Sequence, residues 1–215
     1  MYTVSSDLPN ERPARRGHAV SEVYFVTHPE VVIDPGVPVP DWPLSEIGRA
    51  RMEAFSTALN GRRIAAIYAS AERKARDGAE ILAQRFGLQV RVRAGLEEND
   101  RSATGYIAPP EFWEVVEQFF ARPAESVRGW VTAQESQIRI VQALRNTCAE
   151  NAGTGLVIVV SHGGVGRLLR ASLEDVAIGN EGRPLHPGGG CYFPLDRRTL
   201  ALLGPWRSIE DYPGH

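Results

Sequence analysis

Two of the five histidines lie just after short apolar runs, and this shared position makes them the first candidates for chemistry. One residue separates His28 from the run 23–26, and one residue separates His162 from the run 156–160. Such runs are typical of strands covered on both faces of a parallel sheet. Because ligands of open α/β sheets bind at the carboxyl ends of strands, we expect both imidazoles to reach one crevice. A single histidine in this position more often only caps its strand, but the pair favours a site.

A third predicted strand end carries positive charge. Residues 68–70 lead into a predicted helix whose first turns contain Arg73, Lys74 and Arg76. Free N–H groups at a helix N-terminus favour an anion there. A solvated helix face is the alternative, and we prefer it for Arg76. Lys74, the only lysine among 24 lysine and arginine residues, is the candidate anion ligand because its turn is aimed at the same crevice.

The loop 96–101 brings carboxylates and one arginine together without an obvious packing role. A carboxyl group beside the crevice can act as a general acid, and a solvated loop is an equally good interpretation. A metal site is disfavoured, because the chain has no His-Glu-x-x-His motif and no short ligand pair. The Gly-x-Ser-x-Gly motif of many serine hydrolases is also absent.

Strands and helices alternate along most of the chain, which predicts an α/β three-layer sandwich with a largely parallel central sheet. Residues 1–20 are predicted to form a flexible tail, and residues 21–215 a single domain with an inserted segment around 94–131. A capping box is predicted at Thr132 and Glu135. The predicted strands are 23–26, 64–68, 89–93 and 155–160, followed by a β-hairpin of 191–195 and 199–203. The predicted helices are 45–60, 71–86, 132–148, 165–173 and one that opens at 109–110.

Composition excludes several classes of protein. The formal net charge of −2 argues against a non-specific nucleic-acid binder. No apolar run approaches the roughly 18 residues of a membrane span, and the first residues lack the apolar core of a signal peptide. Two cysteines are too few for a disulfide scaffold. We therefore expect a cytoplasmic protein.

Five segments, in order, resemble motifs of the histidine phosphatase superfamily, which has the phosphoglycerate mutase-like fold, over about residues 22–205. Residues 27–30 read Thr-His-Pro-Glu where that family has Arg-His-Gly-Glu, and 159–164 closely match its second histidine motif. The other three segments are 43–50, which resemble its Pro-Leu-Thr helix start, 68–82, which resemble its Ser-Pro-Leu-x-Arg-Ala segment, and 96–98, which resemble its Leu-x-Glu motif.

The resemblance implies a role for each matching residue. His28 would attack phosphorus and become a phosphohistidine, and Glu98 would protonate the leaving oxygen. His162, Lys74 and Gly163 would bind the phosphoryl group. The two imidazoles are then expected to face each other across one phosphate-sized pocket. Neither a metal nor an organic cofactor is implied, because the family uses side-chain cations.

Two positions depart from the family pattern. Thr27 and Lys74 stand where the family has arginines, which removes bidentate contacts to the phosphoryl oxygens. Losing one such donor can raise the activation free energy by about 3–4 kcal/mol, which lowers kcat roughly a hundred- to a thousandfold. The Thr27 hydroxyl and Arg101 are candidate replacements.

Two functions therefore remain open. The first is a phosphatase-like hydrolase of a small phosphorylated molecule, and the second is a catalytically impaired module that binds phosphate or another anion. A phosphomutase is less favoured, because the inserted segment has no clear basic patch for a second phosphate. The substrate and the oligomeric state have no readable signal in the sequence.

Overall fold

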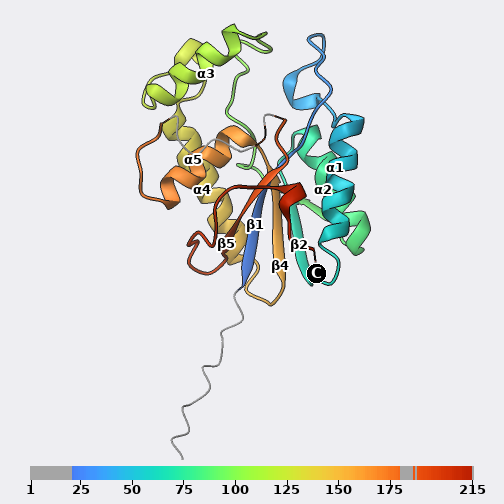
Figure 1. The fold of residues 1–215 in the computed structure, drawn as a ribbon. Helices are drawn as coiled ribbons and strands as arrows, with labels where there is room; N and C mark the ends of the chain where they lie inside the picture. The colour runs from blue at the N-terminus through green and yellow to red at the C-terminus, as the bar shows by residue number, and fades with distance from the viewer. Residues whose placement is uncertain (1–20, 180–185, 187, 215) are drawn as a thin grey trace, which may run out of the picture.

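The apolar run that begins at Val23 lies at the centre of a mixed sheet (Figure 1). The computed structural model describes residues 21–179, 186 and 188–214. Within these residues six strands form one sheet in the order β3-β2-β4-β1-β5-β6. Strands β1 to β4 pair in parallel, whereas β5 is antiparallel to β1 and β6 is antiparallel to β5. The strands are β1 (Glu22–Thr27), β2 (Ile64–Ala69), β3 (Val90–Val92), β4 (Leu156–Ser161), β5 (Cys191–Asp196) and β6 (Arg207–Ser208).

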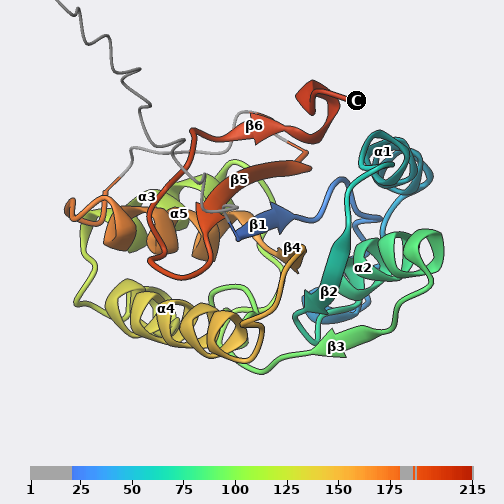
Figure 2. The same ribbon diagram turned by 90° about the horizontal axis from the view of Figure 1, so that it is seen from below.

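Helices cover both faces of the sheet, as Figure 2 shows: α1 and α2 lie on one face, and α4 and α5 on the other. The predicted three-layer architecture is therefore confirmed. The helix α4 begins with the predicted capping box, in which Thr132 and Glu135 exchange hydrogen bonds. The helices are α1 (Glu46–Ala58), α2 (Arg73–Phe86), α3 (Glu111–Ala121), α4 (Ala133–Ala149) and α5 (Gly163–Leu173), with 3₁₀ turns at Val39–Asp41, Val127–Gly129 and Ile209–Asp211.

The alternation of side chains along β1 divides the core between the two helical layers. Val23 and Phe25 pack with the cluster under α4 and α5, whereas Tyr24 and Val26 pack with the cluster under α1 and α2. Burying a large apolar side chain contributes roughly 1.5–3 kcal/mol, so both layers hold the central strand in its register. The two clusters therefore also fix the end of β1, where His28 follows.

The segment 94–131, which the sequence predicts to be an insertion, supplies most of a third and smaller core cluster. Phe119 and Trp130 pack in this core, which reaches Leu168 of α5. Figure 1 shows α3 beyond the end of the sheet, on the side of α5. The insertion is thus attached to the layer that carries the second histidine motif.

The predicted C-terminal hairpin is present, but its second arm is shorter than expected. Leu202 forms an antiparallel bridge with Leu195, and backbone hydrogen bonds from Asp196 to Ala201 and from Leu203 to Pro194, both at 2.9 Å, flank this bridge. The rest of 199–203 forms no regular strand, because Leu200 has a φ of 60° directly after a turn that the Asp196 carboxylate closes. At its other end β5 pairs with β6.

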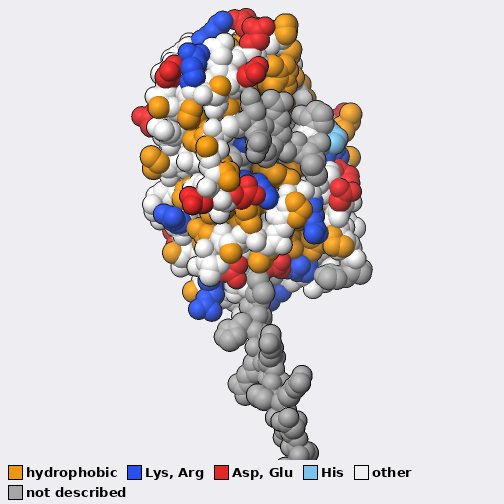
Figure 3. All heavy atoms as spheres, turned by 60° about the vertical axis from the view of Figure 1, so that its left-hand side comes forward, with side chains coloured by type: hydrophobic (Ala, Val, Ile, Leu, Met, Phe, Trp, Pro, Cys, Tyr) orange, Lys and Arg blue, Asp and Glu red, His pale blue; other side chains and the backbone are white. Residues whose placement is uncertain are grey.

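The predicted tail 1–20 lies outside the described residues. No helix in the described part of the chain is long and apolar enough to cross a membrane. On the face drawn in Figure 3, acidic, basic and apolar side chains are interspersed.

Candidate functional site

His28 and His162 are brought together by two neighbouring parallel strands. The register pairs Thr27 of β1 with Ser161 of β4, and the backbone N–H of His28 donates to the carbonyl of Ser161 at 3.0 Å. The two ring centroids are 5.1 Å apart, with the planes at 68°. The two imidazoles lie side by side as expected, but the expected phosphate-sized pocket between them is absent. At this edge-to-face contact distance no group fits between the rings, so a ligand must approach both from one side.

The His28 ring is held in an orientation that suits a nucleophile. Its Nδ1 lies 2.8 Å from the carbonyl oxygen of Pro29, which can only accept, so Nδ1 carries the proton and donates. Removal from water, with help from His162 and Lys74, lowers the pKa of His28 to about 3. The imidazole is therefore neutral at pH 7, and its Nε2 lone pair is available for attack.

His162 is fully buried at the start of α5. Its Nε2 lies 2.7 Å from the Ser70 hydroxyl and 3.4 Å from Oε1 of Glu72, whereas its Nδ1 has no hydrogen-bond partner in the described part of the chain. Burial lowers the pKa of His162, although the charges of Glu72 and Glu98 oppose this effect. The unpartnered Nδ1 is a position at which a ligand can complete the hydrogen bonding of this residue.

Lys74 is buried, as a ligand of a closed site would be, but it already has two partners. Its ammonium group donates to the carbonyl of Val39 at 2.9 Å and to the carboxylate of Glu72. Burial raises the pKa of Glu72, yet His162 and Lys74 overcome this effect and lower the pKa to about 2. Glu72 is therefore a carboxylate at neutral pH, inside the cluster of His162 and Lys74.

Sequence reasoning assigned no role to Ser70 or Glu72, although both contact His162. They lie in the turn between β2 and α2, four and two residues before Lys74. Their position directly after a strand end was the available signal, the same one that identified the two histidines.

Glu98 caps the helix α5 with its carboxylate. Its two oxygens accept N–H groups from Asn99, Gly164 and Val165, each at 2.9 Å. A Cβ on Gly164 would lie 2.5 Å from Oε1 of Glu98, so this contact requires glycine. As a general acid, Glu98 must carry a proton on one of these oxygens and release the N–H group bound there. Its neighbour Glu97 instead binds the N–H of Gly95 at 2.6 Å.

The structure corrects the expected role of Thr27. Its buried hydroxyl accepts the N–H of Cys191 at 2.9 Å and donates to the carbonyl of Cys191 at 3.3 Å. Both hydrogen-bonding functions of the hydroxyl are thus used between β1 and β5. Thr27 is a link between strands, and it has no capacity left for a phosphoryl oxygen in this arrangement.

Arg101 and Gly163 approach the histidines from two different elements. The Arg101 guanidinium lies over the ring of Phe112 at 5.1 Å and over that of Trp130 at 5.7 Å, and its charge contributes to the lowered pKa of His162. Gly163 is the first residue of α5 and follows His162 directly. Arg76, as expected, is half-exposed on α2 and pairs with Glu80.

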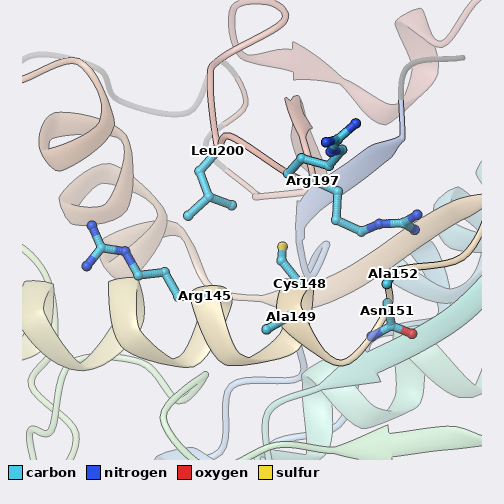
Figure 4. A pocket seen from close by; sticks show the side chains of 8 residues that line it. Arg145, Cys148, Ala149, Asn151, Ala152, Arg197 and Leu200 are labelled. Atoms are coloured by element: carbon cyan, nitrogen blue, oxygen red, sulfur yellow. The ribbon is translucent and has the colours of Figure 1, made fainter. Parts of the chain in front are cut away.

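A separate cavity of about 350 Å³ lies at the opposite end of the strands, where α4 ends and β4 begins (Figure 4). It is lined by residues that include Cys148, Arg197 and Leu200 and by none of the residues discussed above as site candidates. Among residues 21–179, 186 and 188–214, no group of three His, Cys, Asp or Glu side chains is arranged to hold a metal ion.

Several solved structures have a fold similar to that of this chain. A mycobacterial glucosyl-3-phosphoglycerate phosphatase matches with 22% identity over 87% of this chain and 96% of its own, at a TM-score of 0.64. YhfR from Bacillus stearothermophilus matches with 19% identity over 85% of this chain and 94% of its own, at a TM-score of 0.71. A phosphoserine phosphatase variant from Entamoeba histolytica matches with 15% identity over 88% of this chain and 98% of its own, at 0.71.

At these identities the similarities show the fold, which is phosphoglycerate mutase-like. A search of curated protein sequences found no significant match. The model of the histidine phosphatase superfamily (branch 1), however, matches residues 23–192, a range that includes both central histidines and the loop between β3 and α3. This chain therefore belongs to branch 1 of the histidine phosphatase superfamily.

Proposed function

We propose that this protein hydrolyses the phosphate ester of a small molecule through a phosphohistidine at His28. The observation that carries the proposal is the neutral, oriented His28 ring in contact with His162. A neutral imidazole whose Nδ1–H is held by a carbonyl presents its Nε2 lone pair to an electrophile. The similar solved structures include phosphatases of a glucosyl-phosphoglycerate and of phosphoserine, which agrees with a small substrate.

The reaction has two steps. In the first, Nε2 of His28 forms a bond to phosphorus while the bond from phosphorus to the ester oxygen breaks, and Glu98 gives its proton to the leaving alcohol. In the second, water attacks phosphorus, Glu98 takes a proton from it, and the bond from phosphorus to Nε2 breaks to release inorganic phosphate. Lys74, His162, Arg101 and the N–H of Gly163 are the proposed phosphoryl ligands.

A second function, anion binding without turnover, is favoured by one observation. Lys74 is paired with Glu72, and the Thr27 hydroxyl is engaged by Cys191, so two positions that would stabilise the transferring phosphoryl group are occupied by internal contacts. Charge stabilisation of the phosphoryl oxygens is usually the largest catalytic contribution in phosphoryl transfer. A protein that binds phosphate but turns over slowly is therefore the specific alternative.

Hydrolysis of an aryl phosphate by the wild type and by His28→Asn distinguishes the two functions. As an enzyme, the wild type releases phosphate, and His28→Asn lowers the rate at least a hundredfold. The exposed histidine variant His186→Asn serves as a matched control and keeps the wild-type rate. Incubation with a ³²P-labelled ester should leave acid-labile label on the wild type and none on His28→Asn.

Background hydrolysis by both proteins, combined with vanadate binding by the wild type, would support the anion-binding module. A rate that is unchanged in His28→Asn would overturn the proposed nucleophile. A panel of phosphorylated metabolites then identifies the preferred leaving group.

A further inference from the structure

Glu72 is a buried residue at the start of α2 whose side chain does not cap the helix. It is the N-cap residue of α2, yet its carboxylate makes no hydrogen bond to the first turn of that helix. Instead it accepts the ammonium group of Lys74, accepts the N–H of Glu98 at 2.7 Å and lies 3.4 Å from Nε2 of His162. One buried carboxylate thus joins α2, the inserted segment and the turn before α5.

The partners of this carboxylate are the groups that a phosphoryl ligand needs. Lys74 supplies the buried cation of the site, and His162 supplies the buried imidazole. Both Lys74 and Glu72 act on the pKa of His28, which places the ion pair beside the proposed nucleophile. An incoming anion meets a lysine that already donates two of its three N–H groups, one to Glu72 and one to the carbonyl of Val39.

We propose that Glu72 is a resident anion that competes with the phosphoryl group for Lys74 and so sets the affinity of the site. This inference rests on the proposed phosphoryl site at His28 and adds to it a residue that determines affinity. Glu72 is a positioning residue: it does not contact the ligand, and it acts by holding the ammonium group of Lys74 in a hydrogen bond to its own carboxylate. Ligand binding draws Lys74 away from the Glu72 carboxylate toward a phosphoryl oxygen.

The charges around the histidines explain why the exchange is costly. Burial lowers the pKa of both histidines, so the imidazoles are neutral, and the buried cation beside them is paired with the Glu72 carboxylate. The Lys74–Glu72 pair carries no net charge, and a phosphoryl dianion gains little from Lys74 while Glu72 stays in place. Replacing Glu72 by its neutral isostere leaves Lys74 as a buried cation without a carboxylate, which favours any anion that reaches it.

The chain offers a direct probe of the exchange, because Lys74 is its only lysine. Labelling with ¹³C,¹⁵N-lysine gives a single Cε signal in the NMR spectrum of the wild-type protein. Titration with vanadate should shift this signal as Lys74 leaves Glu72 for the oxyanion. The measurement needs no substitution and no turnover, so it applies to an enzyme and to a binding module alike.

Affinity is then compared in Glu72→Gln, with Glu80→Gln as the matched control on the exposed face of α2. We expect vanadate to bind Glu72→Gln at least tenfold more tightly than the wild type, and Glu80→Gln to bind it like the wild type. The double variant E72Q/K74M should lose the gain, because the tightening depends on Lys74. If Glu72→Gln folds poorly, the vanadate-induced rise in its Tm should exceed that of the wild type.

Each outcome separates this inference from the proposed function. A lysine signal that does not move while calorimetry shows vanadate binding overturns the competition by Glu72 but leaves the phosphoryl site intact. Equal affinity of the wild type and Glu72→Gln has the same meaning. If neither protein binds vanadate, the phosphoryl site itself is rejected, and the competition with it.

Discussion

The hydroxyl of Thr27 bridges both backbone groups of Cys191, so that the end of β1 is tied to the beginning of β5. The residue lies next to His28 in the chain, but its side chain is used for sheet pairing. The residue that we expected from the sequence to be a phosphate ligand therefore contributes to the scaffold in this protein. Stability and ligand affinity should respond very differently to substitution here.

Thr27→Val keeps the shape of the side chain and removes the hydroxyl. Because the N–H of Cys191 loses its acceptor inside the protein, the free energy of unfolding should fall by about 1–3 kcal/mol. Vanadate affinity should change by less than about twofold, since the hydroxyl is not a ligand. Thr57→Val on the exposed side of α1 is the matched control, with an expected change under about 0.5 kcal/mol. A large loss of vanadate affinity at normal stability would show that the Thr27 hydroxyl is a ligand.

Gly164→Ala tests whether the Glu98 carboxylate must lie at the N-terminus of α5. The new Cβ would lie 2.5 Å from Oε1 of Glu98 and 2.6 Å from Nδ2 of Asn99, so the carboxylate must leave the end of α5. We expect a loss of about 1–3 kcal/mol in urea unfolding, the usual range for overpacking, and a lower kcat. Gly153→Ala, whose Cβ would meet nothing within 4 Å, is the control and should be close to neutral. Normal stability and rate in the Gly164→Ala variant would show that the position of Glu98 is adjustable.

Stability should fall on mild acidification because of the two histidines. Below pH 6.5 the unfolded chain protonates both, whereas burial lowers the pKa of His28 to about 3 and also lowers that of His162 in the folded protein. The unfolded state then binds more protons, so His28 should remove about 1 kcal/mol of stability between pH 6.5 and 5.5, and His162 acts in the same direction. Urea unfolding at the two pH values checks this. His28→Asn should weaken the pH dependence, and a wild type of constant stability would contradict two neutral histidines in the folded protein.

Thr132→Ala removes the cap of α4 at a point remote from the histidines. The hydroxyl accepts the N–H of Glu135 at 3.2 Å, and loss of such a cap typically costs about 1 kcal/mol. Thermal unfolding should show a lower Tm, with kcat and KM unchanged. Thr132→Ser retains the acceptor and should recover most of the stability. A change in kcat without a change in Tm would mean that α4 influences the site directly.

The elements that follow from local rules were the ones that the sequence predicted well. The buried strands before His28 and His162 are unbroken apolar runs, and the cap at Thr132 depends on residues three positions apart. In both cases the information is contained within one short segment. The ends of the strands then predict that His28 and His162 converge. Because β1 and β4 pair in parallel, the residues that directly follow the paired Thr27 and Ser161 must lie close together.

The direction of a polar side chain within the site was not predictable in the same way. Thr27 finds its partner in Cys191, 164 residues further along the chain, and Glu72 turns toward Lys74 and His162 instead of capping its own helix. Each choice depends on which donors the tertiary structure leaves without an acceptor. The C-terminal hairpin was predictable as a pairing, but the length of its second arm was not, because Leu200 with a φ of 60° interrupts the strand just before the bridge at Leu202.

The register of β1 against β4 has a consequence for how this protein can be re-engineered. Pairing of Thr27 with Ser161 sets the separation of the two imidazoles from within the sheet, whereas the segment around Arg101 and Phe112 is built on a separate small core. Libraries that randomise residues 102–113, and so keep the proposed ligand Arg101, should therefore sample new ligand preferences at constant histidine geometry. In evolutionary terms, the two histidines are inherited with the sheet, and the choice of ligand can drift with residues 102–113.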